Sequence, residues 1–252
     1  MNKLLEIRNV GLTYQTINDE ITAIKNLSFS CDEKDFVSII GPSGCGKTTI
    51  LSLIAGLIKP TEGKILLNGK EVSKNNHSLG YMLQKDQLFP WRTIEKNIYL
   101  PLEVKKINNK ENQLYAQSLL DKYGLGEFRN NYPEQLSGGM RQRAALIRTL
   151  TSKPQLLLLD EPFSALDYQT RLSVCDDVYN IIKTERKTAI LVTHDISEAI
   201  SMSDIIIVLT ERPAKVKSIH IPNISGDSPL KRRESQDFGL WFERIWKELN
   251  QR

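Results

Sequence analysis

Short apolar runs, each closed by a glycine or a charged residue, recur along the chain. Residues 36–40, 156–159, 188–193 and 205–209 are apolar runs of strand length. Strands of this length that are apolar on both faces, separated by helical segments, are typical of a parallel sheet covered on both sides. The pattern therefore predicts an α/β protein. In such sheets polar chemistry gathers just beyond the carboxyl ends of the strands.

A second sheet and a helical insertion are predicted around this core. Residues 3–30 alternate in strand fashion, and the Asn68-Gly69 pair favours a hairpin turn, so we expect an antiparallel sheet at this edge. From about 88 to 150 the strand pattern disappears, and helical stretches replace it (93–100, 111–123 and 137–150).

The end of the chain carries an amphipathic pattern. Its apolar residues recur at helical spacing, and we expect this helix to pack on the protein's own body rather than on lipid (Phe238, Trp241, Phe242, Ile245 and Leu249). The predicted organisation is one domain over residues 1–215, with its helical insertion at about 88–150. A C-terminal extension then covers 216–252.

Residues 41–48 match the pattern GxxxxGK[ST] between an apolar strand and an apolar helix. Glycines allow successive backbone N–H groups to turn toward a phosphate, and the following helix points its positive end at the same anion. Lys47 would reach the β- and γ-phosphates, while the Thr48 hydroxyl would bind Mg²⁺. The flanking strand and helix disfavour a glycine turn without a ligand. The expected nucleotide-binding residues are Gly41, Ser43, Gly44, Cys45, Gly46, Lys47, Thr48 and Thr49.

Polar side chains also follow three other apolar runs. Asp160 and Glu161 come after four leucines: Asp160 would hold Mg²⁺, and Glu161 could orient and deprotonate an attacking water. His194 follows the run 188–193. A lone histidine there is more often structural, but catalytic groups after the neighbouring strands favour a catalytic role. Gln84 ends another short apolar run, and its amide could bind a metal or a water.

Residues 136–142, Leu-Ser-Gly-Gly-Met-Arg-Gln, resemble the LSGGQ signature of ABC ATPases, with Met140 at the usual glutamine position. Ser137 is a good N-cap, and Gly138 and Gly139 leave amide N–H groups bare at a helix start. One domain has little use for two such phosphate-binding corners. In the family, the signature of one subunit closes over ATP held by the glycine loop of the other. The resemblance therefore implies a dimer, for which two copies of this chain suffice.

The resemblance extends from about residue 5 to residue 215. Tyr14 fits the aromatic that stacks on adenine, Gln84 the Q-loop, Asp167 the D-loop (164–167) that contacts the opposite subunit, and His194 the switch histidine that senses γ-phosphate. The family implies ATP and Mg²⁺ as cofactors. It also implies a P-loop NTPase fold with a mostly parallel core sheet, an antiparallel β subdomain and a helical signature subdomain.

One residue departs from the family pattern. Lys34 stands near the usual Gly-Glu position before the first core strand, where a positive φ would strain the turn by about 1 kcal/mol. The departure affects the expected local stability and not the expected site.

Residues 88–93 and 211–213 resemble the nitrate, sulfonate and taurine-type importer branch, which also serves thiamine-precursor pyrimidines. That branch implies two transmembrane permease subunits, an extracytoplasmic solute-binding protein that acts indirectly, and a peripheral position on the cytoplasmic side of the cell membrane. An exporter subunit, a soluble ABC ATPase not linked to transport, and a non-hydrolysing scaffold are the alternatives. The transported solute cannot be read from this chain.

Composition further narrows the partners and the cellular compartment expected for this protein. A net charge of +4, with basic residues spread along the chain, argues against a nucleic-acid partner. The three cysteines show no CxxC spacing, which favours a reducing, cytosolic compartment. No apolar run approaches the ~20 residues that a membrane-spanning helix needs, and no signal-peptide core opens the sequence. Any membrane association is thus expected to come through a partner.

Overall fold

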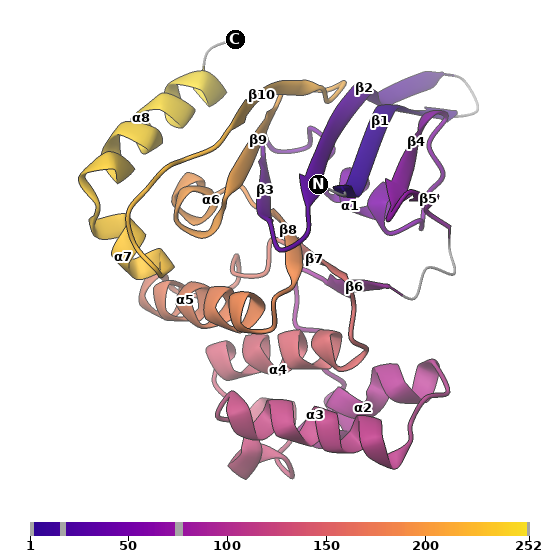
Figure 1. Cartoon of the computed structure of the whole chain (residues 1–252), viewed down its shortest axis with the longest axis vertical. Coiled ribbons are helices and arrows are strands. Elements are labelled where there is room, and N and C mark those ends of the chain that lie inside the picture. The colour runs from indigo at the N-terminus through magenta and orange to yellow at the C-terminus, as the bar shows by residue number, and fades with distance from the viewer. Residues whose placement is uncertain (1–2, 16–18, 74–77, 251–252) are drawn as a thin grey trace. The chain divides into compact units, whose positions relative to one another are not determined.

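The computed structural model describes residues 3–15, 19–73 and 78–250. The chain forms two compact units, whose elements are labelled in Figure 1. The first unit comprises Met1–Asn76 and Arg186–Arg252, and the second comprises His77–Glu185. Within the described residues, no helix is long and apolar enough to cross a bilayer.

The first unit contains parallel strands that are buried along their whole length. Strand β3 (Phe36–Ile40) pairs in parallel with β8 (Thr188–Val192) on one side and with β9 (Ile205–Leu209) on the other. Strand β10 (Val216–His220) pairs antiparallel with β9. This arrangement confirms the mostly parallel core sheet. Helix α1 (Lys47–Ile54) follows β3 after the glycine loop and contacts β8.

The same unit carries the predicted antiparallel sheet. Its strands lie in the order β2-β1-β4-β5. Asn68 and Gly69 have φ of 50° and 72°, the two positive values that a tight hairpin turn requires. The strands are β1 (Lys3–Gln15), β2 (Glu20–Asp32), β4 (Glu62–Leu67) and β5 (Lys70–Glu71).

The C-terminal helix packs on the body of the first unit, as expected. Ile245 of α8 (Gln236–Asn250) is buried with Ile200 and Val208, and Figure 1 shows α8, in yellow, beside α6 (Ile196–Met202). Phe238, Trp241 and Leu249 pack against the same cluster. Between α6 and α8 along the chain lie β9, β10 and the short helix α7 (Pro229–Glu234).

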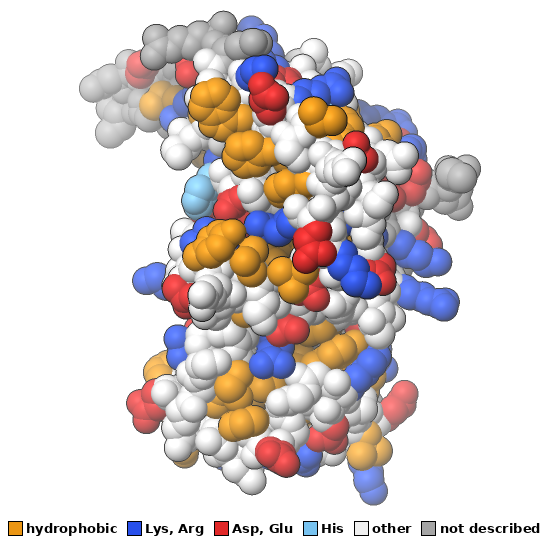
Figure 2. All heavy atoms as spheres, turned by 90° about the vertical axis from the view of Figure 1, so that its left-hand side faces the viewer, with side chains coloured by type: hydrophobic (Ala, Val, Ile, Leu, Met, Phe, Trp, Pro, Cys, Tyr) orange, Lys and Arg blue, Asp and Glu red, His pale blue; other side chains and the backbone are white. Residues whose placement is uncertain are grey.

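Phe242, which the sequence pattern assigned to the packed face, was predicted wrongly. Phe242 is 37% exposed, and Leu240 and Trp246 are more exposed still. The contact stripe is narrow and follows positions 238, 241, 245 and 249, so a residue one position beyond Trp241 turns outward. Figure 2, which views the left-hand side of Figure 1, shows hydrophobic side chains scattered among charged side chains of both signs.

Polar contacts anchor the end of α8. The Nε2 atom of His220 lies 2.8 Å from Oε2 of Glu248 and 2.8 Å from Oγ of Ser218, and Lys217 Nζ donates to the Glu248 carbonyl at 2.7 Å. Burial raises the pKa of Glu248, but hydrogen bonds from Ser218 and His220 outweigh it, and the net shift is downward. The carboxylate is thus kept charged where it joins α8 to β10.

The second unit holds a parallel strand pair and the predicted helices. Strand β6 (Leu79–Met82) pairs with β7 (Leu156–Asp160), and Asp160 is the last strand residue rather than the first residue beyond it. Helix α4 contacts all three of the other helices. The helices are α2 (Ile94–Val104), α3 (Lys110–Lys122), α4 (Gly138–Thr151) and α5 (Tyr168–Thr184), with 3₁₀ turns η1 (Gly126–Phe128) and η2 (Pro133–Gln135).

Side chains cap two helix starts in this unit, and Ser137 was the N-cap expected from the sequence. Thr93 and Ser137 cap α2 and α4 by accepting hydrogen bonds from the Lys96 and Met140 amides at 3.3 Å each. Helix α2 continues four residues beyond the predicted end at Leu100, through Pro101. Pro101 does not end the helix, although proline removes one helical hydrogen bond.

The beginning of α4 packs closely on α5. A Cβ atom at Gly139 would lie 2.8 Å from Val174 Cγ2, and one at Gly138 would lie 3.0 Å from Leu166 Cδ2. Neither glycine has positive φ. Space, and not backbone conformation, is therefore what these positions require.

Lys34 adopts the strained conformation that its position suggested, with φ of 72°, while its amide donates to Thr188 Oγ1 at 2.7 Å. Lys34→Gly should therefore raise the free energy of unfolding by about 1 kcal/mol, because glycine tolerates this φ. Urea denaturation measures the change. Lys34→Ala, which keeps the Cβ atom, is the matched control and should stay within about 0.5 kcal/mol of wild type.

Gly139→Ala should destabilise the protein by about 1 kcal/mol, because the clash with the stiff Val174 side chain exceeds the gain in helix propensity. Val174→Ala removes the clashing methyl group. In a double-mutant cycle followed by thermal melting, the two substitutions together should cost less than the sum of the single costs. Strict additivity would show that α4 and α5 do not press together at Gly139.

Candidate functional site

The loop before α1 is shaped to present backbone amides. Gly44 and Gly46 have φ of 76° and 120°, values that side-chain-bearing residues rarely adopt. Gly46 is the N-cap of α1, and no side chain caps this helix start. An anion is the partner that such bare amides and the positive helix end attract. The loop and helix thus fit a phosphate group.

Lys47 lies over this loop. Its side chain is 7% exposed, and its Nζ atom donates to the carbonyl oxygens of Gly41 at 2.9 Å and Pro42 at 3.1 Å. These bonds fold the ammonium group back along residues 41–46. A positive charge is therefore held at the loop that the bare amides form.

Cys45 fills the inside of the loop. Its side chain is 2% exposed, and a Cβ atom at Gly41 would lie 3.1 Å from its sulfur. Burial raises the pKa of the Cys45 thiol, and the nearby Lys47 charge opposes this only in part. The Cys45 backbone amide donates to the Pro42 carbonyl at 3.3 Å, and the sulfur supports the loop from within.

His194 follows β8 in the same unit, on a rigid turn. Thr193 Oγ1 donates to the buried Glu198 carboxylate at 2.6 Å, and Asp195 caps α6 through the Ser197 and Glu198 amides at 2.7 and 3.1 Å. The imidazole itself is exposed. The predicted switch histidine is therefore held in place by its neighbours along the chain.

Tyr14 lies near the end of β1 and is 37% exposed. It belongs to the lining of an open pocket on the antiparallel sheet (Thr13, Tyr14, Gln15, Glu20, Thr61 and Glu62). An exposed aromatic face in such a pocket can stack on a flat ring.

The acidic pair stands in the second unit. Asp160 is 6% exposed and accepts a hydrogen bond from the Tyr81 hydroxyl at 3.3 Å. Glu161 has φ of 44°, a left-handed conformation that costs a non-glycine residue stability and concentrates at functional sites. Its carbonyl oxygen accepts from the Ser164 amide at 3.2 Å and from the Ser164 hydroxyl at 3.0 Å. A tight turn thus follows Asp160 directly.

Ser164 joins this turn to the predicted Q-loop. Gln84 lies two residues beyond the end of β6, and its Nε2 atom donates to Ser164 Oγ at 3.3 Å. The structure therefore brings Gln84 to the turn that carries Glu161, within one unit. The sequence singled out Ser164 only as the first D-loop residue, and no signal in it indicated this contact.

The signature and the D-loop each contain a helix cap. Ser137 caps α4, and Asp167 caps α5 by accepting from the Thr170 amide at 3.1 Å. Hydrogen bonds from Thr170 lower the pKa of Asp167. Leu166 of the D-loop lies against Gly138. The second unit thus gathers the signature, the D-loop, Gln84 and the acidic pair, whereas the glycine loop, Tyr14 and His194 belong to the first.

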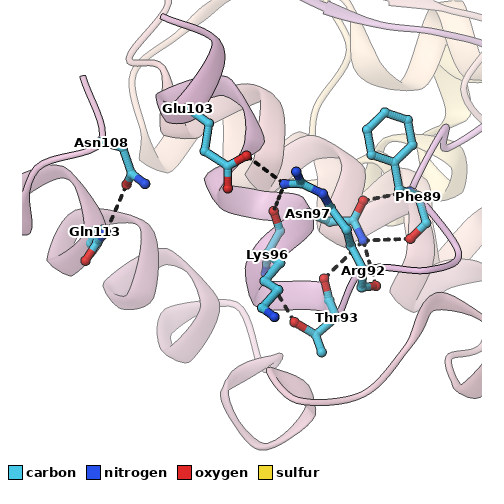
Figure 3. Close-up of polar contacts among 8 residues, drawn as sticks. All are labelled: Phe89, Arg92, Thr93, Lys96, Asn97, Glu103, Asn108 and Gln113. Carbon is cyan, nitrogen blue, oxygen red and sulfur yellow. Dashed lines mark hydrogen bonds and ion pairs between the residues drawn. The ribbon is translucent and has the colours of Figure 1, made fainter. Parts of the chain in front are cut away.

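A turn after Gln84 carries an aromatic pair, Phe89 and Trp91, and Figure 3 draws Phe89 with the polar side chains around it. Phe89 and Trp91 stack with ring centroids 4.9 Å apart, and Trp91 is 71% exposed. The fully buried Asn97 accepts from the Phe89 amide at 2.7 Å and donates to the carbonyls of Phe89, Arg92 and Thr93 at 3.0–3.1 Å. Sequence reasoning missed Asn97, because an asparagine inside a helical stretch gives no sign that it bonds the turn before its helix.

Metal-binding groups are few. No group of three or more His, Cys, Asp or Glu side chains among the described residues could hold a metal ion. Mg²⁺ usually keeps several waters and is held by one or two carboxylates together with substrate phosphates, so the predicted donors fit that ion only beside a nucleotide. These donors are Thr48 in the first unit and Gln84 and Asp160 in the second.

Comparison with known proteins agrees with this geometry. Residues 24–164 match the ABC transporter family model. The uncharacterized ABC transporter ATP-binding protein YtlC of Bacillus subtilis (strain 168) is 48% identical over 98% of this chain and 95% of its own length. The aliphatic sulfonates import ATP-binding protein SsuB of Bacillus cereus (strain ZK / E33L) is 36% identical over 98% and 94%.

Solved structures show the same fold. A dimeric post-hydrolysis state of the ATP-binding cassette MJ0796, bound to ADP and Pi, superposes with a TM-score of 0.71 at 31% identity, covering 86% of this chain and 98% of that one. A second dimeric structure of MJ0796, described as a bacterial ABC transporter cassette, gives a TM-score of 0.73 at 33% identity over the same shares. The protein therefore belongs to the ABC transporter family and is an ATP-binding, ATP-hydrolysing subunit with the P-loop ABC ATPase fold.

Proposed function

We propose that this subunit hydrolyses ATP as one half of a pair, and that the pair drives import of a small solute through membrane partners. The proposal rests on one observation: the chain has two helix starts suited to binding phosphate. They are the start of α1 after the glycine loop and the start of α4 after Ser137. One nucleotide needs only one loop, so the second helix start serves a nucleotide held by another copy. The dimeric MJ0796 structures support this arrangement.

In the proposed cycle, ATP binds first at the glycine loop. Lys47 exchanges the carbonyls of Gly41 and Pro42 for the β- and γ-phosphate oxygens, and the amides of residues 44–49 surround the phosphates. Tyr14 stacks on the adenine ring. Thr48, Gln84 and Asp160 would hold Mg²⁺, which, when bound, neutralises negative charge on the phosphate oxygens.

Glu161 and His194 act in the hydrolysis step. Glu161 accepts a proton from the attacking water, and its left-handed backbone holds the carboxylate at the end of β7. His194, on its rigid turn, holds the γ-phosphate. Contacts from Ser137 and Gly139 of the second copy to this phosphate favour the closed pair, and phosphate loss removes them, so the pair reopens. Asp167 and the D-loop lie at the interface between the copies.

Glu161→Gln tests this mechanism. The amide cannot accept the proton, so phosphate release should fall about 100-fold while ATP still binds. Under Mg-ATP the variant should then accumulate as a dimer in size-exclusion chromatography. Adding Lys47→Ala in the same background removes the phosphate contact and should return the protein to a monomer. A Glu161→Gln variant that binds ATP but stays strictly monomeric would contradict the two-copy site.

The membrane partners are proposed to contact the exposed turn around Phe89 and Trp91. A short cytoplasmic helix of a permease subunit would lie against this turn and against Leu83, which is 45% exposed. Two permease subunits, an extracytoplasmic solute-binding protein acting through them, and a peripheral position on the cytoplasmic side complete the proposed assembly. The similarity to SsuB supports an aliphatic sulfonate or a related small solute.

The importer proposal can be tested by reconstituting this subunit in vesicles with its permease subunits and solute-binding protein, once a pull-down has identified them. The reconstituted complex should hydrolyse ATP faster when the loaded binding protein is present on the outside of the vesicles. Trp91→Ala should abolish this stimulation while leaving hydrolysis by the isolated subunit intact. Stimulation by a solute on the cytoplasmic side alone would favour an exporter.

A further inference from the structure

The turn that follows Gln84 is fixed to helix α4 by two arginines. Arg148 donates through Nη1 to the Gln87 carbonyl at 2.6 Å and through Nη2 to the Asp86 carbonyl at 2.7 Å. Gln87 sits at φ of 51°, and the Asp86 carboxylate accepts from the Leu88 amide at 3.0 Å. Burial lowers the pKa of Arg148, and the nearby Asp86 charge opposes that shift. Backbone and side chains together hold one shape for this turn.

Asp86 also reaches the signature. Its second carboxylate oxygen accepts from Arg141 Nε at 3.2 Å, one turn into α4. Arg141 Nη1 donates to the Leu136 carbonyl at 2.7 Å, and its amide donates to the Ser137 carbonyl at 3.0 Å. The Arg141 guanidinium therefore donates both to Asp86 and to Leu136, which precedes α4. The chain Asp86–Arg141–Leu136 links the turn after Gln84 to the signature.

This link has a mechanical consequence. Charge-assisted hydrogen bonds from a planar guanidinium fix direction as well as distance. A displacement of the turn would be carried through Arg141 to Ser137, whose cap sets the amides at the start of α4. The link lies wholly within the second unit and includes no residue of the glycine loop.

We propose that Asp86 is a positioning residue that holds the signature turn, through Arg141, in the orientation in which it meets a phosphate. The proposal rests on the proposed function for the identity of that phosphate. Asp86 belongs to none of the motifs named above. Its proposed role is to fix the position of the signature relative to the turn after Gln84. Asp86 itself touches no nucleotide.

Asp86→Asn tests the proposal, because it keeps the size of the side chain and removes its charge. Hydrogen–deuterium exchange should become about fivefold faster at the amides of residues 139–141, the effect of one partly exposed ion pair. In ATP hydrolysis kcat should fall about threefold to fivefold, whereas the half-saturating ATP concentration, set by the glycine loop, should stay within twofold. Asp86→Glu, which keeps the charge, should remain within twofold of wild type in both measurements.

Asp121→Asn is the matched control. Asp121 forms an ion pair with Arg129 at 2.8 Å in the same unit, and its side chain is 57% exposed, against 27% for Asp86. Its substitution should leave exchange at 139–141 and kcat unchanged. Arg141→Gln and the double variant complete a cycle in which loss of Asp86 should add nothing once Arg141 is gone.

Unchanged exchange at residues 139–141 in Asp86→Asn, or additive effects in the cycle, would overturn the proposal. So would an equal loss in Asp86→Asn and Asp121→Asn. If the wild-type protein failed to hydrolyse ATP, the proposed function would fall, yet the exchange cycle would still decide whether Asp86 positions the signature turn.

Discussion

Backbone amides can surround an anion only where the chain turns without side chains in the way, and this constraint shapes both helix starts that we propose to bind phosphate. At the glycine loop the requirement is conformational: Gly44 and Gly46 take φ values that other residues avoid. At the start of α4 the requirement is spatial, because Leu166 and Val174 leave no room for a Cβ atom at Gly138 and Gly139. The same residue type thus answers two different physical demands.

The second unit concentrates the connections between motifs. Gln84 donates to Ser164 in the D-loop, the D-loop residue Leu166 touches Gly138, and Asp86 reaches the signature through Arg141. The two hydrogen bonds join residues 80 and 55 positions apart in the chain. Elements joined in this way respond together, which is what a subunit needs if a partner's movement is to alter the fit of a phosphate.

Much of the fold was predictable from the sequence because burial leaves a periodic trace. The runs that form β3, β7, β8 and β9 are apolar on both faces, and the cap Ser137 marks the start of α4. The glycine loop and the acidic pair were also recognisable, since their chemistry restricts residue types at fixed spacing.

Features that depend on a side chain's hydrogen-bond partners left no such trace. Asn97 looks like any helical asparagine until its four hydrogen bonds are seen, and Asp86 like a surface acid until Arg141 is beside it. Phe242 was misplaced because helical period alone cannot set the width of a packed stripe. Gln84 was recognised by resemblance, and its bond to Ser164 emerged only from the fold.

The attachment of α8 makes the tail part of the core rather than an appendage. Ile245 shares its cluster with Ile40, Ile200 and Val208, and Glu248 is tied to β10 through His220. A chimaera that exchanged only this tail with a relative would place a foreign surface against α6 and β9. Such a chimaera would stay soluble only if the residues of α6 that contact the tail were exchanged together with it.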